Sequence, residues 1–111
     1  MHGEAHLYRP GDMAPTVTTF TAVPDLETLK AMLDGGWLEA VPGFTRYPSR
    51  AADRLVRCAA FCDEEGKMKD LPVNEMATML WHAGLQPAQR IDVLVGPVVV
   101  VFGDAEFMRA L

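Results

Sequence analysis

The sequence contains little of the material from which most catalytic sites are built. Two cysteines, three histidines and a single serine, Ser49, are spread over 111 residues. No serine stands in a nucleophile elbow and no glycine-rich loop precedes a helix, which argues against serine hydrolases and phosphate-loop enzymes. We therefore expect a protein that is not an enzyme and that carries no cofactor.

Long apolar segments are also missing. The longest apolar stretch, residues 93–102, is interrupted by a Gly-Pro pair and is far shorter than the roughly 20 residues of a membrane-spanning helix. The first six residues contain neither a basic start nor an apolar run, so no targeting segment is visible. We expect a cytoplasmic protein with no membrane contact, in which His2 and His6 are exposed terminal side chains.

Basic residues are scarce as well. Ten lysines and arginines against 15 aspartates and glutamates give a formal net charge of −5. A chain this acidic repels phosphates, so we expect no direct binding to nucleic acid. A local basic patch remains possible in the few places where basic residues gather.

The remaining composition is typical of an ordinary globular protein, with 50% hydrophobic and 23% charged residues. A chain of 111 residues suffices for one hydrophobic core and is short for two. We therefore interpret residues 1–111 as a single domain.

Turn residues and apolar spacing divide the chain into short strands and two helices. Strands are predicted at 4–9, 16–22, 36–41, 55–62, 91–95 and 98–102, the last two separated by Gly96-Pro97. Helices are predicted at 25–33 and 74–83, with a helical turn in the tail at 104–111, and 44–54 is predicted to be a loop. This order predicts an α+β fold: an antiparallel sheet of about five to six strands with two helices packed against it.

The two cysteines leave minor alternatives open. In a strand, Cys58 and Cys62 lie about 13 Å apart, too far for a disulfide, so we expect reduced thiols. Together with His82 they would supply three metal ligands if the second helix covered their strand. Glu75 and His82 share a helix face and would also suit a cysteine-histidine enzyme. A C-x₃-C pair alone is a weak signal, and we expect no metal site.

The candidate binding residues are Arg46, Tyr47, Arg50, Arg54, Arg57 and Trp37. Four arginines within twelve positions stand out in an acidic chain, and a tyrosine lies among them. Arginine beside an aromatic ring suits a phosphate or carboxylate ligand. The same residue types are enriched in protein interfaces, and a solvated loop is the plainest alternative.

Three segments carry a family resemblance: Gly35–Val41 (GGWLEAV), Cys62–Asn74 (CDEEGKMKDLPVN) and Ile91–Val101 (IDVLVGPVVVV). In this order and spacing they resemble a family of small domains of unknown function from phage, prophage and plasmid proteins. The likeness extends over about residues 25 to 102, and this chain departs from it at Pro97, in the arginine-rich insert 44–57 and in a longer middle helix. The family has no established activity, so the resemblance transfers no catalytic residue.

The resemblance implies a genomic setting in which small acidic proteins act by binding, often against host defence systems. Our leading hypothesis is a non-enzymatic accessory protein that binds and inhibits a host protein complex, as anti-CRISPR or anti-restriction inhibitors do. The alternative is a small-molecule binder that sequesters or senses a nucleotide-like ligand, with the arginines on its phosphates and Trp37 or Tyr47 stacked on its base. A small enzyme using Cys62, His82 or Glu75 is the third hypothesis, and pairing of edge strands would give a homodimer.

Overall fold

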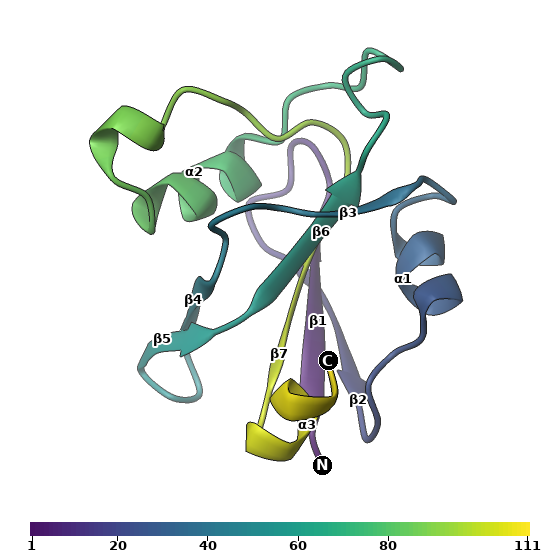
Figure 1. The fold of residues 1–111 in the computed structure, drawn as a ribbon, viewed down its shortest axis with the longest axis vertical. Coiled ribbons are helices and arrows are strands. Elements are labelled where there is room, and N and C mark those ends of the chain that lie inside the picture. Colours follow the sequence, from purple (N-terminus) through teal and green to yellow (C-terminus); the bar gives the residue numbers. More distant parts are fainter.

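The computed structural model describes all residues 1–111 and has an α+β architecture (Figure 1). Its strands are β1 (Gly3–Tyr8), β2 (Thr16–Phe20), β3 (Leu38–Ala40), β4 (Arg46–Ser49), β5 (Arg54–Arg57), β6 (Ala59–Asp63) and β7 (Val98–Gly103). Its helices are α1 (Leu26–Met32), α2 (Glu75–Ala83) and α3 (Ala105–Ala110), with a short 3₁₀ turn, η1 (Pro87–Gln89). No helix has the length and apolar composition needed to cross a bilayer.

Five strands form one antiparallel sheet in the order β2-β1-β7-β6-β3, and β4 and β5 form a separate two-stranded sheet. The predicted fold class is thereby confirmed. The two predicted helices and the helical turn in the tail are all present. For each predicted strand or helix that is present in the structure as a single element, the predicted boundaries agree with the observed ones to within two residues.

The central strand β7 explains the run of valines near the end of the sequence. Val98 to Val101 have no exposed surface, because side chains that alternate along the strand enter two different cores. On one face, Val98 and Val100 pack with Trp81 of α2. On the other, Val99 and Val101 pack with residues of α1 and α3. A strand covered on both faces reads as a continuous apolar run.

Each helix begins at a residue whose side chain accepts a hydrogen bond from a backbone amide three positions later. Asp25 Oδ1 accepts from the Thr28 amide at 2.8 Å, and Asn74 Oδ1 accepts from the Ala77 amide at 3.2 Å. Asp104 caps α3 in the same way. Such caps satisfy amides that have no partner inside the helix, which is why helix starts are readable from sequence.

The prediction of a loop at 44–54 is wrong, because β4 and β5 form a hairpin there. Arg46 pairs with Arg57, and Pro48 with Leu55. Proline is tolerated because each strand of a two-stranded sheet has a free edge. The predicted strand 55–62 is in fact two strands, β5 and β6, which separate at Cys58.

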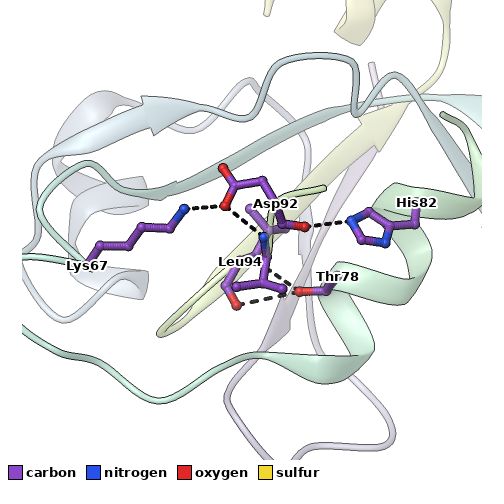
Figure 2. Close-up of polar contacts among 6 residues, drawn as sticks. Lys67, Thr78, His82, Asp92 and Leu94 are labelled. Carbon is purple, nitrogen blue, oxygen red and sulfur yellow. Dashed lines mark hydrogen bonds and ion pairs between the residues drawn. The ribbon is translucent and has the colours of Figure 1, made fainter. Parts of the chain in front are cut away.

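The prediction of a strand at 91–95 is also wrong. The segment lies against α2, and side chains of that helix bind its backbone (Figure 2). The Thr78 hydroxyl accepts from the Leu94 amide at 2.9 Å, and His82 Nε2 lies 2.7 Å from the carbonyl oxygen of Asp92. Hydrogen bonds to polar side chains of α2 take the place of a partner strand here. The β-branched composition of the segment alone does not reveal this.

Asp63 is the only acidic residue that is buried. Its side chain is only 3% exposed at the end of β6. One carboxylate oxygen accepts from Lys69 Nζ at 2.7 Å and the other from the Glu65 amide at 2.9 Å. A methyl group on Gly36 would come within 2.5 Å of the Asp63 Cγ, so the second glycine of the GGWLE motif makes room for this carboxylate.

The Asp63 carboxylate makes the free energy of unfolding depend on pH. Burial alone raises the pKa of Asp63, but Lys69 and the backbone amides outweigh burial and hold that pKa below its ordinary value. The stabilisation is therefore present above the unfolded-state pKa of about 4 and is lost as pH falls through the lower folded-state value. Asp63→Asn is expected to lower the free energy of unfolding by about 1–2 kcal/mol at pH 7 and by much less near pH 2.5, measured by urea denaturation. Glu64→Gln, in the exposed part of the turn, is the control; an equal loss for Asp63→Asn at both pH values would contradict the assignment.

Candidate functional site

The β4–β5 hairpin carries all four arginines of the predicted site. Arg46 and Arg57 are directly opposite each other across the two strands, Arg54 begins β5, and Arg50 lies in the connecting turn. All four side chains are exposed. Like charges placed opposite one another on a strand pair are destabilising, so the hairpin retains this arrangement at a cost to its own stability.

Three of these arginines surround one depression together with a residue that lies far away in the sequence. The depression has a volume of about 640 Å³ and lies between the hairpin and the junction of β7 with α3. The side chains most important for its chemistry are Arg46, Arg54, Leu55, Arg57, Met108 and Arg109. Figure 1 shows the hairpin and α3 projecting toward the same end of the molecule.

No carboxylate neutralises this cluster. The ion pairs of the structure involve the N-terminus, His6, Lys67 and Lys69, and none involves an arginine. Four guanidinium groups are thus left free around one hollow in a protein whose net charge is −5. Planar guanidinium groups bind carboxylates and phosphates through paired hydrogen bonds, so the depression is suited to an anionic partner.

Tyr47 and Arg50 belong to a different pocket. Tyr47 alternates with Arg46 along β4, so its ring points inward, and it is 3% exposed. With Arg50 it lines a second pocket of about 540 Å³, whose other lining residues include Glu4, His6 and Phe102. The structure therefore divides the predicted site into two.

A continuous chain of hydrogen bonds follows the wall of this second pocket. His6 Nε2 lies 3.1 Å from Glu4 Oε1, His6 Nδ1 lies 2.8 Å from the Tyr47 hydroxyl, and that hydroxyl lies 2.5 Å from the hydroxyl of Tyr8. Burial is the main cause that raises the pKa of both tyrosines, so both keep their protons. The expectation that His6 is an exposed terminal side chain is wrong, since only 15% of it is exposed.

Trp37 is not part of either site. It lies between α1 and β3, is 62% exposed, and its ring centroid is 5.1 Å from the Lys30 ammonium group. Helix α1 packs on the face of the main sheet opposite to the one that Tyr47 of the hairpin contacts. With Trp37 remote and Tyr47 buried, the arginine depression has no exposed aromatic ring on which a nucleotide base would stack.

The cysteines and His82 do not converge. No group of three histidine, cysteine or acidic residues is arranged to hold a metal ion, so the suggested metal set of Cys58, Cys62 and His82 is wrong. Both thiols are free. Burial raises the pKa of Cys58 to about 12 and that of Cys62 to about 11, and a protonated thiol is a poor nucleophile. His82 contacts a backbone carbonyl instead of a thiol.

Sequence reasoning missed four residues of these sites. Glu4, His6 and Tyr8 alternate along β1 and therefore share one face, a signal that was available in the sequence. Arg109 had no comparable signal, because its approach to the hairpin depends on how α3 packs after β7. All four residues lie near the ends of the chain, far in sequence from the arginine-rich segment that supplied most of the predicted site.

Residues 1–109 match the model of a protein family described as a domain of unknown function, DUF3846. No curated protein and no solved structure matches the chain.

Proposed function

The chain belongs to the DUF3846 family, which has no assigned function, and we propose from the geometry of the site that it is a non-enzymatic protein that binds an acidic surface of a partner protein. One observation carries the proposal. Arg46, Arg54 and Arg57 of the hairpin and Arg109 of α3 surround one depression, and none has a carboxylate partner within the chain.

The apolar residues among these arginines favour a protein over a small anion. Leu55 is 62% exposed and lies in the lining of the depression with Met108. Interfaces commonly combine an apolar centre with arginines that are desolvated when the partner binds. A site for a lone phosphate has no need of an exposed leucine.

The arrangement of Arg46 opposite Arg57 supports the same proposal. The mutual repulsion of two facing cations is relieved when carboxylates of a partner approach both of them. Acidic side chains on the partner would also steer the encounter, which makes association fast and sensitive to salt. The positive patch is local, so the net negative charge of the rest of the chain selects against partners that are acidic over a wide area.

The class of partner is inferred from the resemblance and not from the geometry. Proteins of phage and plasmid origin commonly act on host defence complexes, and we propose that this chain inhibits such a complex, in the manner of an anti-CRISPR or anti-restriction protein. Inhibition would follow from occupation of the acidic surface that the complex uses.

The decisive experiment compares two double variants with equal charge change. Arg54→Glu/Arg57→Glu alters the depression, whereas Arg9→Glu/Arg50→Glu alters exposed arginines outside it. The partner is captured from host lysate with the tagged wild-type protein, purified, and its affinity for each variant is measured. We expect the first variant to bind at least 100-fold more weakly, and the second to bind within about threefold of the wild type. Each tenfold change in affinity corresponds to about 1.4 kcal/mol of binding free energy.

Folding and salt dependence complete this test. Arg57→Glu places an acid opposite Arg46, so the hairpin itself should be no less stable, and circular dichroism checks this. The dissociation constant should rise with ionic strength as the charges are screened. Equal binding by both double variants would refute the assignment of the arginine depression.

The alternative hypothesis, a nucleotide-like ligand, predicts that the same arginines bind a small molecule in the absence of any partner protein. If the depression holds phosphates, ATP, ADP-ribose or a cyclic nucleotide raises the melting temperature of the isolated protein, and Arg54→Glu/Arg57→Glu abolishes the shift. We expect no shift, because the depression has no aromatic platform for a base.

A further inference from the structure

The pocket that contains the hydrogen-bond chain has the build of a second binding site, separate from the arginine depression. Its floor is one face of the main sheet, where His6 of β1 and Phe102 of β7 lie. Its walls are the hairpin, through residues 48–51, and the connection between β1 and β2, through residues 13–15. The volume of about 540 Å³ is that of a small-molecule site.

With His6 neutral, the hydrogen-bond chain runs in one direction. A carboxylate only accepts hydrogen bonds, so His6 Nε2 must carry the proton that is donated to Glu4. In the neutral imidazole Nδ1 then accepts from the Tyr47 hydroxyl, and the oxygen of Tyr47 accepts from the hydroxyl of Tyr8. Every polar hydrogen in the chain is used, so the wall offers a ligand only acceptor lone pairs, on Glu4 and on the two tyrosine hydroxyls.

Opposite charges border this pocket. The Glu4 side chain is 27% exposed and borders the pocket at the His6 end. Arg50 borders the pocket from the hairpin turn, which also carries Ser49 and Ala51 of the lining. Glu4 and Arg50 do not pair with each other. The pocket therefore contains an acceptor for a cation and a donor for an anion that do not neutralise each other.

We propose that this pocket binds a small extended zwitterion, whose ammonium group pairs with Glu4 and whose carboxylate pairs with Arg50. The methylene groups between the two charges lie against the apolar part of the lining, which includes Met13, Val17 and Phe102. The unused lone pair of the Tyr8 hydroxyl accepts a further hydrogen bond from the ligand.

The test uses ω-amino acids of increasing length. The ¹⁵N-labelled full chain is titrated with 3-aminopropionate, 4-aminobutyrate and 6-aminohexanoate, and amide shifts are followed by NMR. We expect saturable shifts in β1 and in residues 48–51 for at least one of them. Hexanoate and hexylamine, each with one of the two charges, should bind at least tenfold more weakly. No saturable shift with any member of the series, or equal affinity for a single-charge analogue, would overturn the proposal.

Three variants locate the ligand within the chain. Arg50→Gln and Glu4→Gln should each weaken binding at least tenfold. Arg54→Gln removes an arginine of the same hairpin that borders the other depression, and it should leave the affinity unchanged. If Arg54→Gln weakens binding as much as Arg50→Gln, the ligand occupies the arginine depression and the proposal fails. Partner binding through that depression is measured separately, so either proposal can fail alone.

Discussion

Replacing Asn74 with alanine is expected to lower the free energy of unfolding by roughly 3–4 kcal/mol. Asn74 has no exposed surface. Its amide nitrogen donates to the carbonyl oxygens of Tyr8 at 2.9 Å and Gly96 at 2.8 Å, while its side-chain oxygen caps α2. Loss of a cap costs about 1 kcal/mol, and each buried carbonyl left without its donor adds about 1–1.5 kcal/mol. Urea denaturation of both proteins measures the difference.

Two further substitutions separate the roles of this side chain. Asn74→Ser keeps an oxygen that caps the helix but removes the amide donor, so its loss of stability should be about 1 kcal/mol smaller than the loss caused by alanine. Asn74→Asp keeps the shape but turns an acceptor toward two carbonyls, and it should be at least as harmful as alanine. Asp25→Ala removes the exposed cap of α1, which makes no such long-range contacts, and it should cost less. Wild-type stability in Asn74→Ser would show that the amide contributes nothing.

Phe107→Ala is expected to cost about 3–5 kcal/mol, because this fully buried ring connects α3 to the main sheet. The ring lies against Gly3 and Gly103, which pair with each other across β1 and β7. A methyl group on Gly3 would come within 2.3 Å of Phe107 Cε2, and its three nearest atoms all belong to that ring. Gly3→Ala alone should therefore cost about 2–3 kcal/mol through overpacking.

A double-mutant cycle tests this packing directly. In the Phe107→Ala background the ring is gone, so Gly3→Ala should become nearly neutral. Gly103→Ala serves as the control, since its methyl group would also come within 2.5 Å of the His2 carbonyl oxygen and should remain harmful in both backgrounds. Additive effects of Gly3→Ala and Phe107→Ala would contradict the contact.

The elements that could be predicted from sequence are those with local signals. Helix α2 begins at a capping asparagine and ends before Gly84, so its boundaries follow from the chain itself. The valines of β7 indicate a buried strand without reference to any other residue. Short-range chemistry decides both of these elements, and both predictions are confirmed.

The errors arose where distant residues decide the local structure. The segment 91–95 has strand composition, but Thr78 and His82 of α2 bind its backbone. The hairpin at 46–57 was obscured by Pro48 and by its arginines, because a polar two-stranded sheet has little apolar periodicity. The division of the candidate site follows from β4, which turns Tyr47 inward and Arg46 outward; a loop would not have required this alternation.

The hairpin pairs with no strand of the main sheet. The free energy needed to open it therefore depends on few contacts. Its strands hold each other through four residue pairs, and Tyr47 anchors them to β1. Local opening of the hairpin therefore requires far less free energy than unfolding of the five-stranded sheet. A partner that grips the arginines would suppress this opening, so part of its binding free energy would be spent on ordering the surface that it recognises, and amide exchange in the hairpin would slow on binding while exchange in β7 would not change.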